Sequence, residues 1–209
     1  MELYWNSIWN NEDSDNYKKY IDLNREYIFI DFFKKYGIKS ICDVACGFGK
    51  YSVVCGKNGF DVYGFDISRS SVKITEDMLN EYKINYNEYK VCSIADIKFN
   101  SNVFDGVVAH AVIDHLYYED ALKARDELFR IVRQKGLVYL SFDRLDKEDM
   151  EYPHVILSDG TMKYTKGERK GMVFKYYKDE EIKDMFKDYE VLYFGTDDKG
   201  SRDIIVRKG

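Results

Sequence analysis

Residues 38–51 read Ile38-Lys39-Ser40-Ile41-Cys42-Asp43-Val44-Ala45-Cys46-Gly47-Phe48-Gly49-Lys50-Tyr51 and predict a strand, a tight turn and a helix in succession. The strand ends near an acid, and the turn contains a Gly-x-Gly pair. Glycine lacks a Cβ, so it can adopt the conformations of a tight turn and let a ligand lie against the main chain. The helix that follows begins with unpaired N–H groups and the positive end of its dipole. This pattern indicates a dinucleotide or another nucleoside cofactor and leaves the reaction open.

Length, composition and net charge limit the kinds of protein that this chain can be. The chain has 209 residues, 45% of them hydrophobic, and a formal net charge of −5. This length favours a single domain, residues 1–209, with a core of its own. The acidic balance disfavours a broad surface for nucleic acid or for an anionic membrane. No signal peptide and no apolar run of transmembrane length is visible in the sequence.

The four cysteines do not predict a metal site. Cys42 and Cys46 have a spacing that resembles a metal motif, but Cys42 falls in a predicted strand, and no histidine or second cysteine pair is near in sequence. We therefore expect no metal ion. The cysteines are interpreted as reduced thiols of a cytoplasmic protein.

Strands and helices alternate along the chain from residue 39 onward. The expected strands are 39–44, 61–66, 88–93, 103–109 and 137–142, with helices over 49–58, 69–83 and 118–134. The chain closes with two strands, 190–195 and 203–207, joined by a turn into an antiparallel hairpin. This order predicts a Rossmann-like, doubly wound α/β fold: a mostly parallel seven-stranded sheet with an antiparallel last strand and helices on both faces.

Two flanking regions depart from this alternation. Apolar residues at helical spacing predict an amphipathic helix over 15–36. The stretch 143–177 is polar and is expected to hold a short hairpin, Thr161–Tyr164 with Met172–Tyr177, before a helix over 178–187.

Three acids follow strand ends: Asp43, Asp66 and Asp96. Open α/β sheets bind ligands outside the carboxyl ends of their strands, so these acids are expected to share one edge. A carboxylate at Asp66 can accept both ribose hydroxyls of a nucleoside. Asp96 could accept an adenine amino group, with Ile67 and Ile97 on the two sides of the ring.

These residues resemble the class I S-adenosylmethionine-dependent methyltransferases. The segment 43–49 looks like the glycine-rich first motif of that family, 62–68 like the second motif with its ribose-binding acid, and 94–97 like the third. Residues 104–116, Phe-Asp-Gly-Val-Val-Ala-His-Ala-Val-Ile-Asp-His-Leu, resemble the fourth, and the reversed terminal strand fits the family's fold. The resemblance implies S-adenosylmethionine as methyl donor, S-adenosylhomocysteine as product, and a cofactor site made of Asp43, Ala45, Cys46, Gly47, Gly49, Asp66, Ile67, Ala95, Asp96, Ile97 and His110.

The same resemblance suggests where the acceptor would bind. Residues 1–36 would form a helical lid, and 143–177 would be an acceptor-side insertion. His110 and His115 are the candidate catalytic residues, either of which could act as a base if the acceptor arrives protonated. Candidate substrate residues are Tyr4, Trp9, Arg144, His154 and Tyr176.

The acceptor is expected to be a small molecule, and the protein a monomer or homodimer without nucleic-acid or membrane partners. With Pro153 as its one proline, the chain cannot carry the Pro-Pro motif of methyltransferases that act on DNA amino groups. Two alternatives stay open. A Gly-x-Gly turn followed by Asp66 also suits an NAD-dependent oxidoreductase, and an intact donor site also suits a non-catalytic S-adenosylmethionine-binding module.

Overall fold

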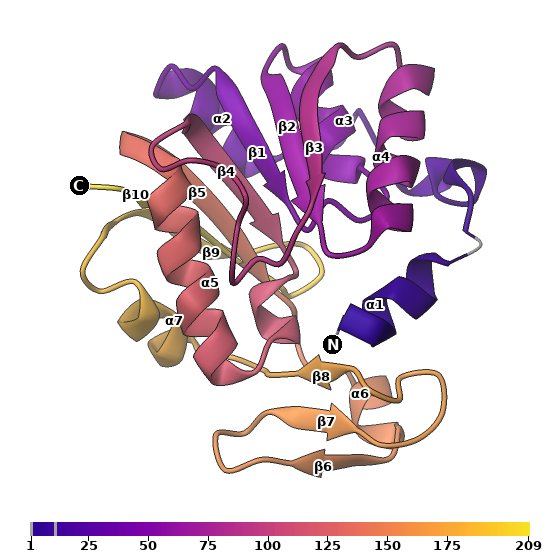
Figure 1. Ribbon diagram of the computed structural model, residues 1–209. Coiled ribbons are helices and arrows are strands. Elements are labelled where there is room, and N and C mark those ends of the chain that lie inside the picture. The colour runs from indigo at the N-terminus through magenta and orange to yellow at the C-terminus, as the bar shows by residue number, and fades with distance from the viewer. Residues whose placement is uncertain (1, 11) are drawn as a thin grey trace.

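The computed structural model describes residues 2–10 and 12–209 and contains a seven-stranded sheet (Figure 1). The strands lie in the order β3-β2-β1-β4-β5-β10-β9. Neighbours are parallel from β3 to β5, whereas β10 is antiparallel to both β5 and β9. The predicted fold is confirmed. The reversed strand, β10, lies between β5 and β9 in the sheet. The strands are β1 Ser40–Val44, β2 Asp61–Asp66, β3 Tyr86–Val91, β4 Phe104–His110, β5 Val132–Phe142, β9 Glu190–Thr196 and β10 Arg202–Arg207.

Helices cover both faces of the sheet. One face carries α2 (Ile28–Lys35), α3 (Lys50–Lys57) and α4 (Arg69–Glu81), and the other carries α5 (Tyr118–Ile131) and α7 (Asp179–Met185). Successive residues of a strand point to opposite faces. Ile41 therefore belongs to the core under α2 and α3, while Cys42 belongs to the core under α5.

The junction between α5 and β5 differs from the prediction. The helix ends at Ile131, three residues earlier than expected. The strand begins at Val132, five residues earlier than expected. The pairing of β5 with β4 jumps from Val132 to Leu137, so the four residues between them form a bulge. The expected helix over 118–134 included the first two of these residues, but all four belong to an interrupted strand.

The expected helix over 15–36 is wrong in extent. The structure has α1 (Glu2–Trp9), two 3-10 turns (Ser14–Asn16 and Lys18–Tyr20), and then α2. The Asp13 and Asp22 carboxylates accept backbone N–H groups two residues ahead, each at 2.9 Å, and such local bonds compete with a continuous helix. α2 is therefore a separate helix that packs in the hydrophobic core on one face of the sheet. The segment before α2 contributes residues near the carboxyl ends of the strands.

The insertion forms a small sheet of its own. Its strands are β6 (His154–Ile156), β7 (Met162–Tyr164) and β8 (Val173–Phe174), preceded by α6 (Lys147–Glu151). The pairing of β7 with β8 confirms the predicted hairpin, and β6 is an additional strand. Tyr4 of α1 packs against the apolar side of this sheet.

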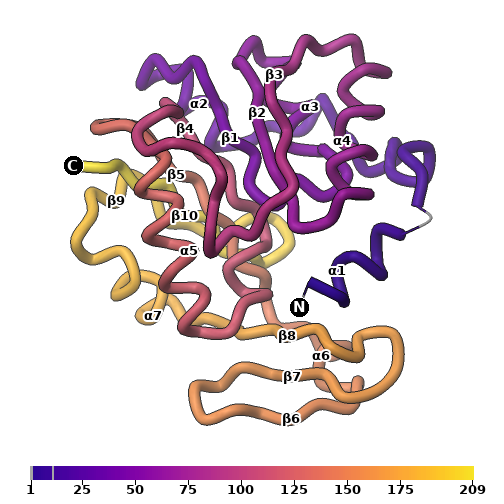
Figure 2. The backbone as a smooth tube through the Cα atoms, in the orientation of Figure 1, coloured from indigo at the N-terminus to yellow at the C-terminus, as the bar shows by residue number. Residues whose placement is uncertain are grey.

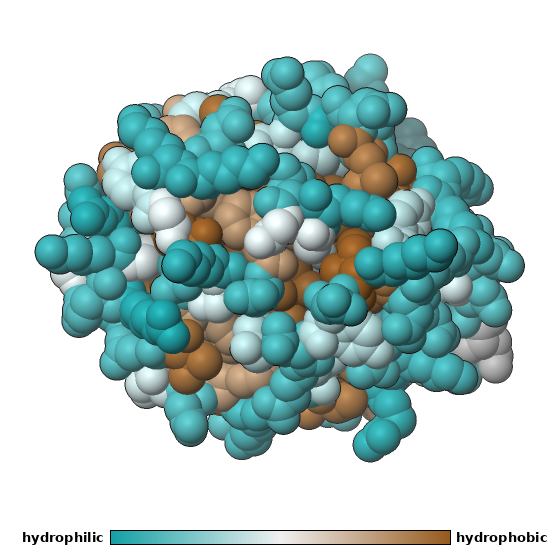
Figure 3. Space-filling model, turned by 90° about the horizontal axis from the view of Figure 1, so that it is seen from above, coloured by the Kyte–Doolittle hydropathy of each residue, from teal (hydrophilic) through white to brown (hydrophobic). Residues whose placement is uncertain are grey.

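The parallel strands all point toward α1 and the small sheet, and the loops that follow them meet there (Figures 1 and 2). Figure 3 shows the opposite side of the molecule, which is covered mainly by hydrophilic side chains. In the described residues, no helix combines the length and apolar character needed to cross a membrane.

Candidate functional site

A cavity of about 330 Å³ lies at the carboxyl ends of β1, β2, β3 and β4. Its volume falls within the range of small-molecule sites, which is about 300–1,000 Å³. Both tryptophans of the chain, Trp5 and Trp9, line it from α1. We call it the donor cavity. It brings together five of the predicted cofactor residues: Ala45, Gly47, Asp66, Ile67 and Ala95.

The glycine-rich loop is clamped between β2 and α4. The Gly47 N–H donates to Asp66 Oδ2 at 3.1 Å, and the Gly47 carbonyl accepts the hydroxyls of Ser71 and Thr75 at 2.7 and 3.0 Å. Gly49 has φ +83°, and a Cβ there would lie 3.0 Å from Thr75 Cγ2. The loop can therefore pass close to α4 only because this position is glycine.

Asp66 ends β2 and is buried. Burial raises the pKa of its carboxyl, and N–H groups of Ser68 and Gly47 act against that rise. Its Oδ1 accepts the Ser68 N–H at 2.9 Å and its Oδ2 accepts the Gly47 N–H. Each oxygen keeps a further acceptor site, so the carboxylate that lines the cavity can still take two hydroxyl groups.

The structure corrects the placement of Asp96 and Ile97. The Asp96 side chain is 70% exposed and pairs with Lys98 on the surface, and Ile97 is buried in the core under α5. Strand β3 ends at Val91 and the chain turns at once, with the Asp96 N–H donating to the Ser93 carbonyl at 3.1 Å. Ser93, Ile94 and Ala95 therefore line the cavity, and Asp96 has already turned away from it.

Three other predicted cofactor residues lie in or next to the glycine-rich loop but do not line the donor cavity. Cys46 is buried and its Sγ lies 3.3 Å from the Thr75 hydroxyl oxygen, and Gly49 forms the turn. Asp43 is buried and accepts the Ser52 hydroxyl at 2.6 Å. Burial raises the pKa of Asp43 to about 7, while the bond from Ser52 acts in the opposite direction.

The raised pKa of Asp43 makes stability depend on pH. The folded state binds this proton more tightly than the unfolded state, whose ordinary value is 3.8. Between pH 4 and 7 the group should therefore lower the free energy of unfolding by about 1.4 kcal/mol per pH unit as pH rises. Asp43→Asn keeps an acceptor for Ser52 but cannot titrate. Urea unfolding across this range should show a shallower decline for the variant, and parallel curves would contradict the assignment.

His110 is not beside the donor cavity, contrary to the prediction. Its ring stacks on Tyr51 of α3, with centroids 4.4 Å apart, and lines a separate cavity of about 340 Å³ with Tyr139 and Asp203. Burial, helped by the charge of Lys50, lowers the pKa of His110 to about 3. The next residue, Ala111, is the one that lines the donor cavity.

The candidate substrate residues separate into two groups. Trp9 lines the donor cavity, and Arg144 lines a neighbouring cavity of about 390 Å³ that we call the acceptor-side cavity. Tyr4 packs on the small sheet, Tyr176 lies under the Arg202 guanidinium, and the His154 Nδ1 lies 2.7 Å from the Tyr152 carbonyl oxygen. These last three are not brought to either cavity.

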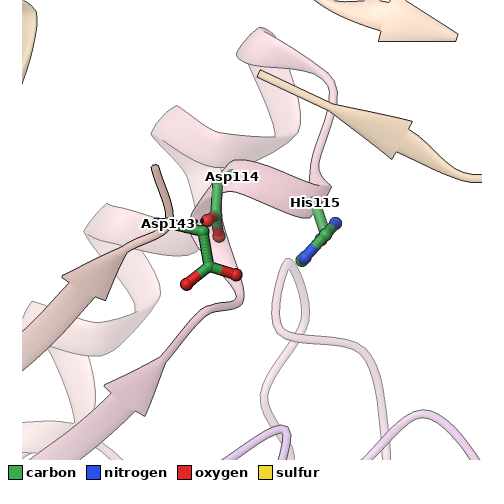
Figure 4. Close-up of side chains that lie close together, drawn as sticks. All are labelled: Asp114, His115 and Asp143. Atoms are coloured by element: carbon green, nitrogen blue, oxygen red, sulfur yellow. Dashed lines mark hydrogen bonds between the residues drawn. The ribbon is translucent and has the colours of Figure 1, made fainter. Parts of the chain in front are cut away.

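His115 lines both the donor cavity and the acceptor-side cavity. It ends a 3-10 turn, Ile113–His115, that follows β4. Its ring meets Trp5 edge-on, with centroids 5.4 Å apart, and its Nδ1 lies 3.2 Å from the Val173 carbonyl oxygen. Figure 4 shows it beside Asp114 and Asp143. Of the two predicted catalytic histidines, this is the one that lines both cavities.

Sequence reasoning missed several residues of the donor cavity. Ser93, Ile94, Val112 and Leu116 all line it. The predicted third motif, 94–97, overlaps the lining segment, 92–95, but is displaced from it by two residues. Val112 and Leu116 lie inside the fourth motif, and only their position after β4 could have indicated them.

Comparisons with known proteins agree with this geometry. Residues 42–140 match the family described as "Methyltransferase domain". An uncharacterized protein of Methanocaldococcus jannaschii is 31% identical over 153 residues, which cover 68% of this chain and 62% of that protein. A Rickettsia prowazekii protein is 25% identical over 117 residues and is covered over 45% of its length. The chain therefore spans less than two thirds of the length of both of these curated relatives.

Solved structures share the whole fold. A SAM-dependent methyltransferase of Methanosarcina mazei has a TM-score of 0.71 at 21% identity, covering 88% of this chain and 98% of that one. Magnesium protoporphyrin IX methyltransferase of Synechocystis, solved with bound SAH, has a TM-score of 0.70 at 17% identity, and both chains are covered completely. The chain therefore contains a methyltransferase domain over residues 42–140 and shares its overall fold, including the reversed strand β10, with solved SAM-dependent methyltransferases.

Proposed function

We propose that this protein transfers a methyl group from S-adenosylmethionine to a small-molecule acceptor. The observation that carries the proposal is the buried Asp66 carboxylate, which lines the donor cavity beside the glycine-rich loop. When bound, S-adenosylmethionine supplies a methyl carbon attached to a cationic sulfur: a lone pair of the acceptor would form a bond to that carbon while the carbon–sulfur bond breaks, leaving S-adenosylhomocysteine. The protein then has mainly to align the two molecules and exclude water.

The lining of the donor cavity fits each part of the donor. Asp66 would accept the two ribose hydroxyls. Ile67, Ile94 and Leu116 offer apolar contacts for the adenine ring. The backbone of the loop at Ala45 and Gly47 would lie along the methionine part, where the missing Cβ of Gly47 leaves room beside Trp9.

The acceptor-side cavity indicates a small, polar acceptor. Its rim carries charges of both signs, among them Arg144, Asp146, Arg169 and Lys199, and its apolar part includes Phe174. Such a cavity can orient a compact charged molecule through several hydrogen bonds. Two structural neighbours are named for small-molecule substrates, magnesium protoporphyrin IX and 1,6-didemethyltoxoflavin, which supports the same class of acceptor here.

Donor binding can be followed with the intrinsic tryptophan fluorescence of the protein. Because the chain has two tryptophans and both line the donor cavity, S-adenosylhomocysteine should change the emission saturably. Trp9→Phe should remove part of this signal without abolishing binding measured by calorimetry. Saturable binding of NADH with none of S-adenosylhomocysteine would instead support the oxidoreductase alternative.

The transfer itself is tested with labelled S-adenosylmethionine and a cell metabolite extract. A labelled small product, identified by mass, is the expected result. Donor binding without transfer to any acceptor would favour the non-catalytic binding module. Label recovered only in added nucleic acid would contradict the proposed acceptor class.

We also propose that the protein works in the cytoplasm. All four cysteines are free and buried, and disulfide-linked frameworks are typical of oxidising compartments. Cell fractionation followed by immunodetection tests this proposal, and recovery from a secreted fraction would contradict it.

A further inference from the structure

Three potential metal ligands meet beside the boundary of the two cavities. Asp114 and His115 follow β4, and Asp143 follows β5 directly. These strands are neighbours in the sheet, so the segments after them come together. Each of the three residues offers one ligand atom, and these atoms all lie within 4.8 Å of one another (Figure 4).

Asp114 carries an unsatisfied buried oxygen, which is an independent sign of a ligand. Its side chain is 0% exposed, and its Oδ2 accepts the Asp143 N–H at 2.8 Å. Its Oδ1 has no hydrogen-bond partner among the described residues. The buried guanidinium of Arg202 donates to the Tyr177 carbonyl oxygen rather than to this carboxylate. A buried carboxylate oxygen without a partner is costly, and a bound cation would remove that cost.

The orientation of His115 leaves one ring nitrogen available. A carbonyl oxygen can only accept, so the Nδ1 beside the Val173 oxygen carries the proton, and Nε2 keeps its lone pair. Metal-binding histidines commonly donate their other ring N–H to a carbonyl or carboxylate in this way. Figure 4 shows one ring nitrogen turned toward the Asp143 carboxylate and the other turned away.

We propose that Asp114, His115 and Asp143 bind a divalent first-row metal ion at the boundary of the donor and acceptor-side cavities. Two carboxylates and an imidazole suit ions such as Mn²⁺ or Zn²⁺. Three protein ligands leave coordination positions open, and His115 and Asp143 both line the acceptor-side cavity. If the proposed function holds, as this step requires, an oxygen of the acceptor would take one of these positions. The sequence argument against a metal considered only the cysteines, and it did not connect Asp114 with Asp143, which lies 29 residues further along the chain.

Calorimetric titration of the full chain with MnCl2 tests the site without any measurement of activity. We expect one saturable site per chain, with affinity reduced at least tenfold in His115→Gln and in Asp143→Asn. Both variants alter side chains that are only partly buried, and thermal melts will verify that they fold. The matched control is Asp146→Asn, which removes a carboxylate from the same cavity and should leave the affinity unchanged. Bound Mn²⁺ should also quench Trp5, whose ring meets His115.

Three outcomes would overturn the proposal: no saturable binding, binding that both ligand variants retain, or binding that Asp146→Asn weakens equally. The last would indicate a diffuse acidic surface. Titration of the wild-type protein with S-adenosylhomocysteine in the same buffer separates the two proposals. Donor binding without Mn²⁺ binding overturns the metal site alone, and Mn²⁺ binding without donor binding overturns the proposed function alone.

Discussion

Asp66→Ala should weaken the binding of S-adenosylhomocysteine by about 30- to 150-fold, a loss of about 2–3 kcal/mol. The wild-type carboxylate lines the donor cavity and can accept two ribose hydroxyls as charge-assisted hydrogen bonds. Alanine removes both acceptors and leaves hydroxyl groups unpaired in a buried place. It also frees the Gly47 and Ser68 N–H groups, so the glycine-rich loop loses one of its anchors.

The matched control for Asp66 is Asp96→Ala. Both acids follow strand ends, but the Asp96 side chain is largely exposed and pairs with Lys98. Its removal should leave the affinity unchanged within a factor of about two. Calorimetry measures both dissociation constants, and thermal melts monitor folding. Equal losses in the two variants, or none in Asp66→Ala, would mean that the nucleoside lies elsewhere.

Gly49→Ala should destabilise the protein by about 2–5 kcal/mol and reduce donor affinity with it. Alanine at φ +83° costs about 1–2 kcal/mol because its Cβ crowds the carbonyl that follows. The same Cβ would lie 3.0 Å from Thr75 Cγ2 and 3.1 Å from Thr75 Cα, which adds an overpacking cost of about 1–3 kcal/mol. Relief of the clash requires α4 to move away from the loop, and Thr75 then loses its bond to the Gly47 carbonyl.

Gly59→Ala separates the two contributions in Gly49→Ala. Gly59 has nearly the same backbone angle, φ +85°, but a Cβ there meets no atom within 4 Å. Its replacement should cost only the conformational part, about 1–2 kcal/mol, and leave donor affinity intact. Urea unfolding measures both variants. If they are destabilised equally, the close approach of the loop to α4 is not what requires glycine at position 49.

The sequence predicted the sheet well because its strands are short apolar runs bounded by turns and acids. The run 61–66 became β2 without a change of boundary, and the terminal hairpin was found from its connecting turn. The glycine-rich turn after β1 was predicted equally well because Gly47 and Gly49 take backbone conformations with positive φ that the turn itself requires. By contrast, the polar residues 133–136 did not reveal that they form a bulge within β5, since their pairing depends on a neighbouring strand.

The site was predicted in part. Asp66, Ile67 and the glycine-rich loop were predicted because each lies at the end of a strand or directly after it. Asp96 was misplaced because the chain turns immediately after β3: Ala95 still lines the cavity, whereas the next side chain, Asp96, is exposed on the surface. His110 was misplaced because it is the last residue of β4 and, by the alternation along the strand, shares the side of Val108, where it stacks on Tyr51 of α3.

The order of strands and helices along the chain and most of the donor end of the site can be predicted from the amino-acid sequence alone. These features follow from local periodicity and from turn residues, which act over a few positions of the chain. Which side chains meet at the acceptor end depends on how distant segments pack together in the folded chain. His115, Asp143 and the tryptophans of α1 come from segments far apart in the sequence, and they converge because parallel neighbouring strands end at the same edge of the sheet.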